Sequence, residues 1–135
     1  LIIWACWTNN LGSGEDCLSL IKDYNFTFVI LVIIPLFALI NAFMEEFVFR
    51  GIIQSSLEKI FLNSKFFSNF LQASTYASIH YIVGFPNGKL GYVMTLIYGW
   101  LLGFMRQKTK GFFLPYFVHI FGDLTVGYLL LFYSG

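Results

Sequence analysis

Long apolar segments separated by short polar stretches run through most of the chain. An almost wholly apolar run covers 26–44, and apolar positions continue at helical spacing from there to Leu62. Three further apolar segments follow, at 66–85, 90–105 and 112–133. A helix needs about 20 apolar residues to cross a bilayer, and these segments are close to that length. The pattern therefore predicts an all-α fold, a polytopic transmembrane bundle of about four to five helices with a polar site between helices.

A polar stretch near the start divides the chain into two parts. Residues 1–7 are apolar, like the end of an earlier helix, and residues 8–23 are rich in Asn, Gly and acidic side chains. We therefore expect 1–25 to be the tail of a preceding apolar segment followed by an exposed loop. The remainder, 26–135, is expected to form the membrane-embedded core.

The first long apolar run is longer than a bilayer is thick. A straight helix over 26–62 would extend for about 55 Å at about 1.5 Å per residue, whereas the hydrocarbon core is about 30 Å thick. Pro35 would kink such a helix, and neighbouring helices in lipid tolerate such a kink. We therefore expect a kink or break near Pro35 or Asn41, or a helix end that projects beyond the membrane.

Small and polar residues inside the later segments predict close helix packing. The segment at 66–85 contains Ser, Gln and Thr, which suit a helix that packs inside a bundle. Gly99 and Gly103 form a G-x-x-x-G motif, which permits two helix backbones to approach closely. These features predict interior helices rather than helices surrounded by lipid on all sides.

The composition supports a membrane protein and excludes several other classes. Hydrophobic residues make up 58% of the 135 residues and charged residues 11%, whereas soluble domains average about 45–50% and about 25%. A net charge of +1 argues against a nucleic-acid partner, and two cysteines are too few for a disulfide scaffold. The expected surroundings of the chain are therefore the lipid bilayer.

Basic residues at the segment ends predict the orientation. If each segment crosses the membrane once, five basic residues share one side: Lys59, Lys65, Arg106, Lys108 and Lys110. Lys22 and Lys89 lie on the other side. Loops rich in Lys and Arg stay on the cytoplasmic side, so the loops at 59–65 and 106–111 are predicted to be cytoplasmic in a multi-pass protein of the cell membrane.

Ionisable residues inside the apolar segments are the main functional signal. Six of them interrupt these segments: Glu45, Glu46, Arg50, His80, His119 and Asp123. A charge at the bilayer centre costs about 2.5–3.5 kcal/mol, whereas one Leu or Phe contributes only about 0.3–0.6 kcal/mol. Such groups are expected to face one another or a wet cavity, which predicts one shared polar site.

The spacing of these residues places them on three helix faces. Three pairs are separated by four residues and can share a face: Glu46 with Arg50, Tyr76 with His80, and His119 with Asp123. Glu45 is rotated by about 100° from Glu46 and points elsewhere. Carboxylates and imidazoles that converge in a cavity of low dielectric constant can activate water and stabilise an oxyanion.

The three motifs together resemble a known family. The stretch EEFVFR at 45–50 matches E-E-x-x-x-R, with the Phe and the following Gly that often accompany it. Tyr76-x-x-x-His80 resembles F-x-x-x-H, and His119-x-x-x-Asp123 resembles H-x-x-x-(N/D). In this order, on successive hydrophobic segments, they resemble the CPBP family of intramembrane proteases. That family comprises CAAX prenyl endopeptidases and bacteriocin-processing or immunity (Abi) proteins.

The resemblance implies a catalytic role for residues of all three motifs. Glu45 would be the general base that, with His80, activates a water to attack a peptide carbonyl. His119 and Asp123 would stabilise the resulting oxyanion or complete a polar cage. The function implied is that of an intramembrane endopeptidase that hydrolyses a peptide bond of a membrane-associated peptide or protein.

Supporting roles and two departures complete the comparison with the family. Glu46 and Arg50 would hold the site together, although Glu46 is sometimes counted as catalytic, and Phe49 would support it. Tyr76 replaces the usual Phe and adds a hydroxyl near the site. Asp123 stands where the prenyl-protease branch commonly has Asn. An ionised Asp cannot donate to an oxyanion, so it would have to be protonated, orient the neighbouring histidine or bind a cation, which leaves a CAAX substrate open.

Two alternatives remain open at the level of sequence. The family has been described both as metalloproteases and as metal-independent glutamyl proteases, and Glu45, His80 and His119 are residue types that bind zinc. The chain has no H-E-x-x-H helix, which favours a site without metal. The alternative function is a non-enzymatic membrane protein, in which the same cluster serves as a proton relay, an ion pathway or a partner-binding scaffold, as in an immunity protein.

Overall fold

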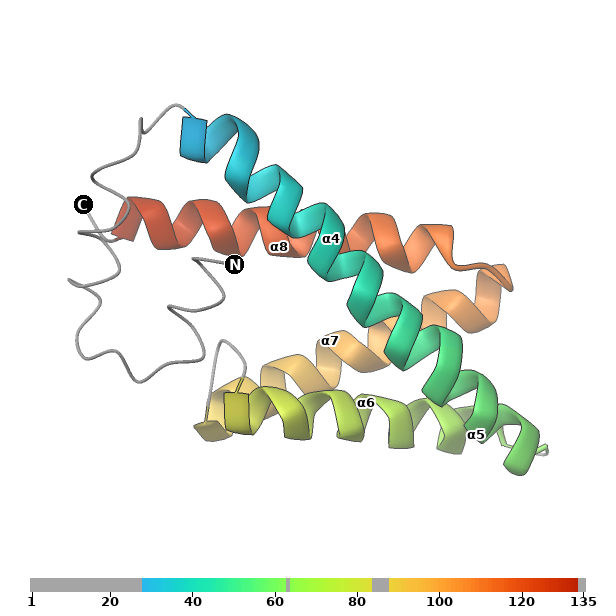
Figure 1. The fold of residues 1–135 in the computed structure, drawn as a ribbon. Coiled ribbons are helices and arrows are strands. Elements are labelled where there is room, and N and C mark those ends of the chain that lie inside the picture. The colour runs from blue at the N-terminus through green and yellow to red at the C-terminus, as the bar shows by residue number, and fades with distance from the viewer. Residues whose placement is uncertain (1–27, 63, 84–87, 134–135) are drawn as a thin grey trace.

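The computed structural model describes residues 28–62, 64–83 and 88–133 (Figure 1). The polar stretch at 8–23 and the predicted boundary after residue 25 lie outside the described residues. The described residues form helices and no strands, which confirms the predicted all-α fold. The elements in chain order are η1 (Val29–Ile33), α4 (Ile34–Glu46), η2 (Phe47–Gln54), α5 (Ser55–Ile60), α6 (Lys65–Val83), α7 (Gly88–Thr109) and α8 (Phe113–Tyr133).

The first helix is continuous from η1 to the end of α5. It breaks neither at Pro35 nor at Asn41, the two positions at which the sequence suggested a kink or break. Instead, the helix contains two π-helical segments, η1 and η2, whose turns are wider than α-helical turns. Pro35 lies in the first turn of α4, directly after η1. Because the helix continues through it, Pro35 leaves one carbonyl of the preceding turn without its usual backbone donor, and the π-helical turns lie next to this interruption.

One face of this helix is buried along its whole length. The buried residues recur at every fourth position, each at most 1% exposed: Ile34, Ala38, Ala42, Glu46, Arg50 and Gln54. In an α-helix, a stripe at this spacing drifts by about 40° per step. The wider turns of η2 rotate less per residue and offset that drift, so the last three members stay on one face. The stripe is therefore apolar in its first half and polar in its second.

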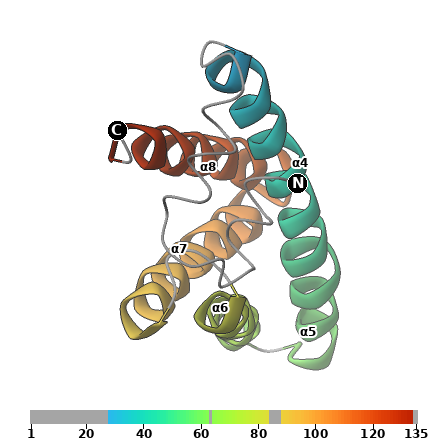
Figure 2. The same cartoon turned by 60° about the vertical axis from the view of Figure 1, so that its left-hand side comes forward.

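The two halves of the stripe pack against different helices. Ala38 and Ala42 form a small apolar core with Ile120 of α8. The polar half faces α6 and α7, which lie side by side and contact each other most extensively (Figures 1 and 2). α7 and α8 meet at the turn between them and diverge away from it. This divergence leaves a polar space between α4, α6, α7 and α8.

Glycines allow the polar half of the stripe to reach the backbone of α7. A Cβ added at Gly99 would lie 2.8 Å from Tyr76 Cδ1, and one at Gly103 would overlap the Asn69 amide. Three side-chain amides therefore donate to backbone carbonyls there: Gln54 to Gly103 (3.1 Å), Asn69 to Trp100 (2.9 Å) and Gln72 to Gly99 (2.9 Å). We call this group the amide seam. The prediction that the G-x-x-x-G motif permits close helix contact is confirmed.

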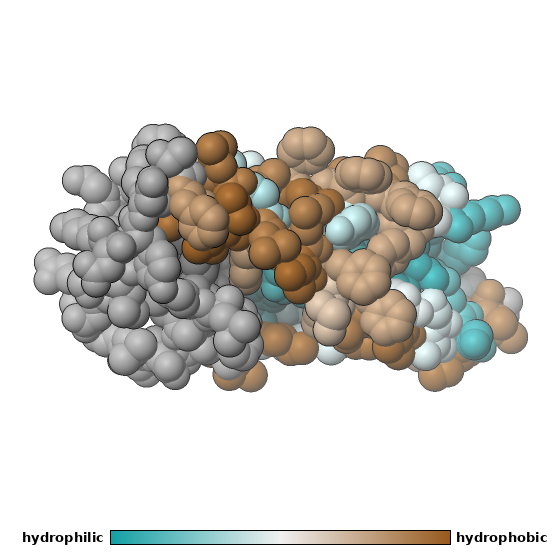
Figure 3. All heavy atoms as spheres, turned by 45° about the horizontal axis from the view of Figure 1, so that its top comes forward, coloured by the Kyte–Doolittle hydropathy of each residue, from teal (hydrophilic) through white to brown (hydrophobic). Residues whose placement is uncertain are grey.

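Apolar side chains cover much of the outside, where a soluble protein would carry polar ones. Large exposed examples occur on each long helix, including Leu31, Phe66, Leu90 and Phe121, all at least 65% exposed. Figure 3 shows an apolar band on one face, with hydrophilic residues gathered at the end where α5 terminates. Within the described ranges, one helix, Leu31–Ile60, is both long and apolar enough to cross a membrane.

Candidate active site

His119 of α8 is the centre of the polar site. Its side chain is 2% exposed, and its Nδ1 lies 2.7 Å from Oε1 of Glu46. Its Nε2 lies 3.4 Å from Oε2 of Glu45 and 3.6 Å from Oδ1 of Asp123. One imidazole thus contacts three carboxylates from two helices. The side chains of the first and third sequence motifs, which lie more than 70 residues apart, therefore meet.

Glu46 and Arg50 form the buried ion pair that their spacing predicts. Arg50 Nη1 lies 2.9 Å from Glu46 Oε1, and neither side chain is exposed. Arg50 Nη2 also donates to the carbonyl of Gly99 (3.2 Å), and the guanidinium lies over the ring of Tyr76 at 4.9 Å. A buried charge requires such partners, since removing one of them leaves the other uncompensated. Arg50 therefore connects the amide seam to the carboxylates around His119.

Asn41 is a member of the site that the sequence analysis did not identify. Its Nδ2 donates to Oε1 of Glu45 (3.2 Å) and to Oδ2 of Asp123 (3.0 Å), and so connects α4 with α8. The sequence analysis considered this position only as a possible helix break. Its spacing of four residues from Glu45 was the available signal, because residues at that spacing share a helix face.

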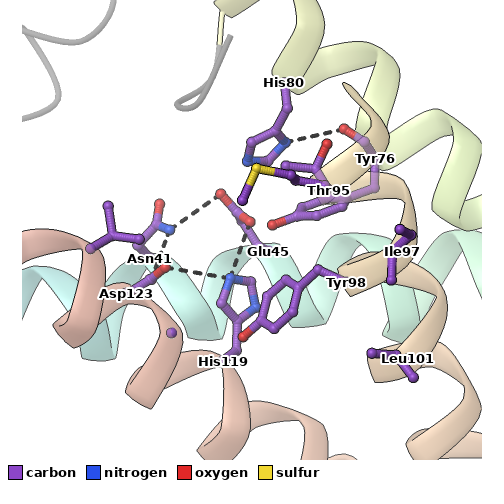
Figure 4. Close-up of a pocket in the computed structure, with 13 residues that line it drawn as sticks. Asn41, Glu45, Tyr76, His80, Thr95, Ile97, Tyr98, Leu101, His119 and Asp123 are labelled. Carbon is purple, nitrogen blue, oxygen red and sulfur yellow. Dashed lines mark hydrogen bonds and ion pairs between the residues drawn. The ribbon is translucent and has the colours of Figure 1, made fainter. Parts of the chain in front are cut away.

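A cavity of about 450 Å³ opens beside these groups (Figure 4). We call it the acidic cavity. Its polar lining comes from α4, α6, α7 and α8: Asn41, Glu45, Tyr76, His80, Thr95, Tyr98, His119 and Asp123. Apolar side chains complete the lining, among them Met94, Ile97 and Leu101 of α7 and Val126 of α8. The cavity therefore combines a carboxylate wall with an apolar wall.

His80 lies in the same cavity but apart from the carboxylate cluster. Its Nδ1 lies 3.1 Å from the carbonyl oxygen of Tyr76, and within the described part of the chain it forms no ion pair with a carboxylate. A carbonyl oxygen can only accept, so Nδ1 donates in this contact, and in the neutral form of the ring Nε2 is then the acceptor. Figure 4 shows Glu45 between the two histidine rings. Glu45, His80 and His119 thus line one cavity. Of the two histidines, His119 is the one with a described ion pair to Glu45.

Two tyrosines flank the central histidine. Tyr76 and Tyr98 meet the His119 ring edge to face, with ring centroids 6.4 Å and 5.7 Å away. The Tyr98 hydroxyl donates to the carbonyl of Val118 (3.2 Å), and a Cβ at Gly122 would lie 2.5 Å from that hydroxyl. Tyr98 was not expected in the site, and nothing in the sequence distinguishes it from the other seven tyrosines.

Phe49, which the family resemblance suggested as a supporting residue, packs against Tyr76. It is 6% exposed, and its ring meets that of Tyr76 edge to face at 4.9 Å. In Figure 4 the ring of Tyr76 extends toward Glu45. Phe49 therefore contributes to the site through packing and adds no polar group to it.

The side chains considered as zinc ligands do not form a metal site. Among the described residues, no group of three or more His, Cys, Asp and Glu side chains is arranged to hold a metal ion. Glu45, His80 and His119 line one cavity, but Nδ1 of His80 faces a backbone carbonyl of its own helix.

The comparisons with known proteins identify the family. No curated protein and no solved structure matches the chain. A sequence model of the family described as type II CAAX prenyl endopeptidase Rce1-like matches residues 27–125. The matched range contains all three motifs, from Glu45 to Asp123, and agrees with the resemblance to CPBP proteases. Because the match covers well over half of the chain, the chain belongs to the type II CAAX prenyl endopeptidase Rce1-like family of membrane proteases.

Proposed function

We propose that this chain is an intramembrane endopeptidase in which Glu45 is the general base that activates water. The observation that carries the proposal is the state of the Glu45 carboxylate. Its Oε1 is held by Asn41, whereas its Oε2 is buried, lies 3.4 Å from His119 Nε2 and, among the described residues, accepts no hydrogen bond. Such an oxygen beside a cavity of about 450 Å³ is suited to accept a hydrogen bond from a water molecule.

The first step would be attack of this water on a peptide carbonyl. Glu45 removes a proton from the water, and the resulting hydroxide forms a bond to the carbonyl carbon. The lone pair on Nε2 of His80 can accept the second hydrogen of the same water and so orient it. These roles are the ones that the family resemblance implies for the two residues.

The second step would be collapse of the tetrahedral intermediate. Glu46 holds Nδ1 of His119, which leaves Nε2 directed at Glu45 and Asp123. A proton on Nε2 makes this atom a donor to the oxyanion. Glu45 then returns its proton to the leaving amine, and the peptide C–N bond breaks. Asp123 acts by orienting His119 and Asn41, and Arg50 keeps Glu46 in place.

The proposed substrate is a membrane-associated peptide or protein of the CAAX type. Met94, Ile97 and Leu101 line the cavity and are each at least 41% exposed, so the apolar wall continues onto the apolar surface of the protein. An apolar side chain or lipid group next to the cleaved bond would find matching surroundings there. We further propose that residues 26–135 form a multi-pass core with the loops at 59–65 and 106–111 on the cytoplasmic side of the cell membrane.

The test is Glu45→Gln in the full-length protein, which removes the base and keeps the size of the side chain. Membrane peptides from cells with wild-type protein and with the variant would be compared by mass spectrometry, and a farnesylated CAAX peptide would be assayed in parallel. Loss of a general base lowers rates by about 10²–10⁴-fold, so we expect the cleavage products to disappear. Unchanged thermal unfolding would show that the loss is chemical.

His80→Ala provides the second arm, with Ser78→Ala as its matched control. Ser78 lies two residues away on the same helix, is exposed and does not line the acidic cavity. We expect the His80 variant to lose activity and the Ser78 variant to keep it. Wild-type processing by both Glu45→Gln and His80→Ala would reject the proposed catalytic roles of these residues. The same cleavage products in cells with and without the wild-type protein would reject the enzyme and support the non-enzymatic scaffold. Cleavage of other membrane peptides but not of the farnesylated one would retain the mechanism and reject the CAAX substrate.

A further inference from the structure

A second cavity lies at the end of the bundle where α5 terminates and α7 turns into α8. Its volume is about 510 Å³, and it shares no lining residue with the acidic cavity. Its charged and amide side chains are Glu58, Lys65, Arg106, Gln107 and Lys110. We call it the basic cavity. The two loops predicted to share one side of the membrane both contribute to it, because Lys65 and Lys110 come from one loop each.

The single carboxylate of the basic cavity is already engaged. Glu58 Oε2 lies 3.1 Å from Arg106 Nη1, and Glu58 Oε1 accepts a hydrogen bond of 2.9 Å from Gln107 Nε2. Arg106 Nη2 also donates to the Ser55 hydroxyl (2.6 Å). The Glu58 and Arg106 charges thus offset each other, and these contacts fix one wall of the cavity.

Two lysines leave the basic cavity with uncompensated positive charge. Across residues 28–62, 64–83 and 88–133, neither Lys65 nor Lys110 forms an ion pair. Both side chains are exposed and can move toward a ligand. Lys59 and Lys108 lie at the same end but do not line this cavity, and Lys108 is placed over the ring of Phe104. Lys65 also lines a neighbouring cavity that Lys108 shares, whereas Lys65 and Lys110 together line the basic cavity.

We propose that the basic cavity binds a phosphate-bearing anion. The phosphate would accept hydrogen bonds from Lys65 and Lys110, while Arg106 remains on Glu58. Three exposed apolar residues lie within three positions of the cavity's lining residues in sequence and suit contact with acyl chains: Ile60 at 70%, Leu62 at 81% and Phe113 at 75%. Basic pockets at the cytoplasmic side of membrane helices bind anionic lipid headgroups in this way. A free phosphate and a lipid headgroup share the chemistry, so the experiment separates them.

The test is a titration of the purified full-length protein with phosphatidylglycerol, followed by native mass spectrometry. Inorganic phosphate and phosphatidylcholine form parallel arms, the first for a soluble source and the second for a lipid without net charge. Each lysine near an anionic headgroup changes affinity by about 5-fold, so Lys65→Gln with Lys110→Gln is expected to weaken phosphatidylglycerol binding by about 30-fold. Binding of inorganic phosphate with the same loss would identify a soluble anion as the ligand.

The matched control is the double variant Lys59→Gln with Lys108→Gln. It removes two charges from the same end of the protein but none from the basic cavity, so we expect it to bind as the wild type does. An equal loss in both double variants would show general charge attraction and overturn the proposal. Binding of phosphatidylglycerol no tighter than that of phosphatidylcholine would also overturn it. The readout is independent of proteolysis, and a failure here leaves the proposed activity untouched.

Discussion

The amide seam and the acidic cavity are both polar interiors of the same bundle, but they hold their polar groups differently. In the seam, Gln54, Asn69 and Gln72 donate to backbone carbonyls, and the glycines of α7 leave no room for another atom. Among the described residues, buried side-chain oxygens without a hydrogen-bond partner occur in both regions, on Gln54 and Gln72 in the seam and on Glu45 in the cavity. Of these three residues, Glu45 alone lines the cavity of about 450 Å³. In lipid, packing and interhelical hydrogen bonds hold helices together. We therefore assign stability to the seam, and the cavity is where the proposed chemistry would take place.

Arg50→Leu should have the largest effect, because Arg50 belongs to both regions. It pairs with Glu46 at 2.9 Å and donates to the seam carbonyl of Gly99. Removing one partner of a buried ion pair costs about 3–5 kcal/mol, so the free energy of unfolding should fall by that amount. Denaturant titration in detergent measures it. The double variant with Glu46→Leu and Arg50→Leu should recover part of the lost stability. An Arg50→Leu variant as stable as the wild type would contradict the account.

Gly103→Ala tests the close packing of the seam. The added Cβ would overlap Asn69 Oδ1 and lie 2.6 Å from Gln72 Nε2, and both amides are held by hydrogen bonds. Overpacking costs about 1–3 kcal/mol, and we expect a lower thermal midpoint with activity per folded molecule unchanged.

Gly51→Ala is the matched control for the seam variant. A Cβ at Gly51 would make only ordinary contacts, the nearest at 3.7 Å. Alanine is the better helix former by about 1 kcal/mol, so this variant should be as stable as the wild type or more stable. If Gly51→Ala and Gly103→Ala lowered the stability equally, close packing at the seam would not explain the loss in the Gly103 variant.

Asn41→Ala should affect the cavity with little effect on the seam. It removes the amide that joins Glu45 to Asp123, and a hydrogen bond to a charged group contributes about 1.5–3 kcal/mol. If that amount is lost mainly from the transition state, kcat falls by about 10–100-fold while KM changes little. A rise in KM with unchanged kcat would instead assign Asn41 to substrate binding.

Metal removal should have the smallest effect. The proposed steps use a water molecule, Glu45 and the two histidines, and none of them requires a metal ion. We expect activity to survive exhaustive treatment with a strong chelator, measured on the same peptide before and after dialysis. Loss of activity that returns only when zinc is added back would contradict this and assign a metal to the cavity.

The sequence predicted what lies within single helices better than what lies between them. The pair of Glu46 and Arg50 followed from their spacing, and the close approach at Gly99 and Gly103 followed from their size. The contact between Asn41 and Asp123 could not be predicted in this way, because the two residues lie 82 positions apart and their contact depends on how α8 is rotated against α4. Helical periodicity gives the face of each helix but not the rotation of one helix against another.

The π-helical segment η2 is a second feature that periodicity missed. It begins directly after Glu46 and keeps Arg50 and Gln54 on the buried face. A stripe at every fourth residue is compatible with an α-helix that drifts and with a wider helix that does not. The choice between them depends on tertiary partners, here the glycine carbonyls of α7 to which both side chains donate.

The most direct test of the account is a double-mutant cycle with Glu45→Gln and His80→Ala. The central claim is that side chains from α4 and α6 act on one water in one cavity. Residues that act as a unit lose activity non-additively, so kcat/KM of the double variant should be no lower than that of the more damaged single variant. Losses that multiply in the double variant would show that the two residues act independently, and would contradict the claim.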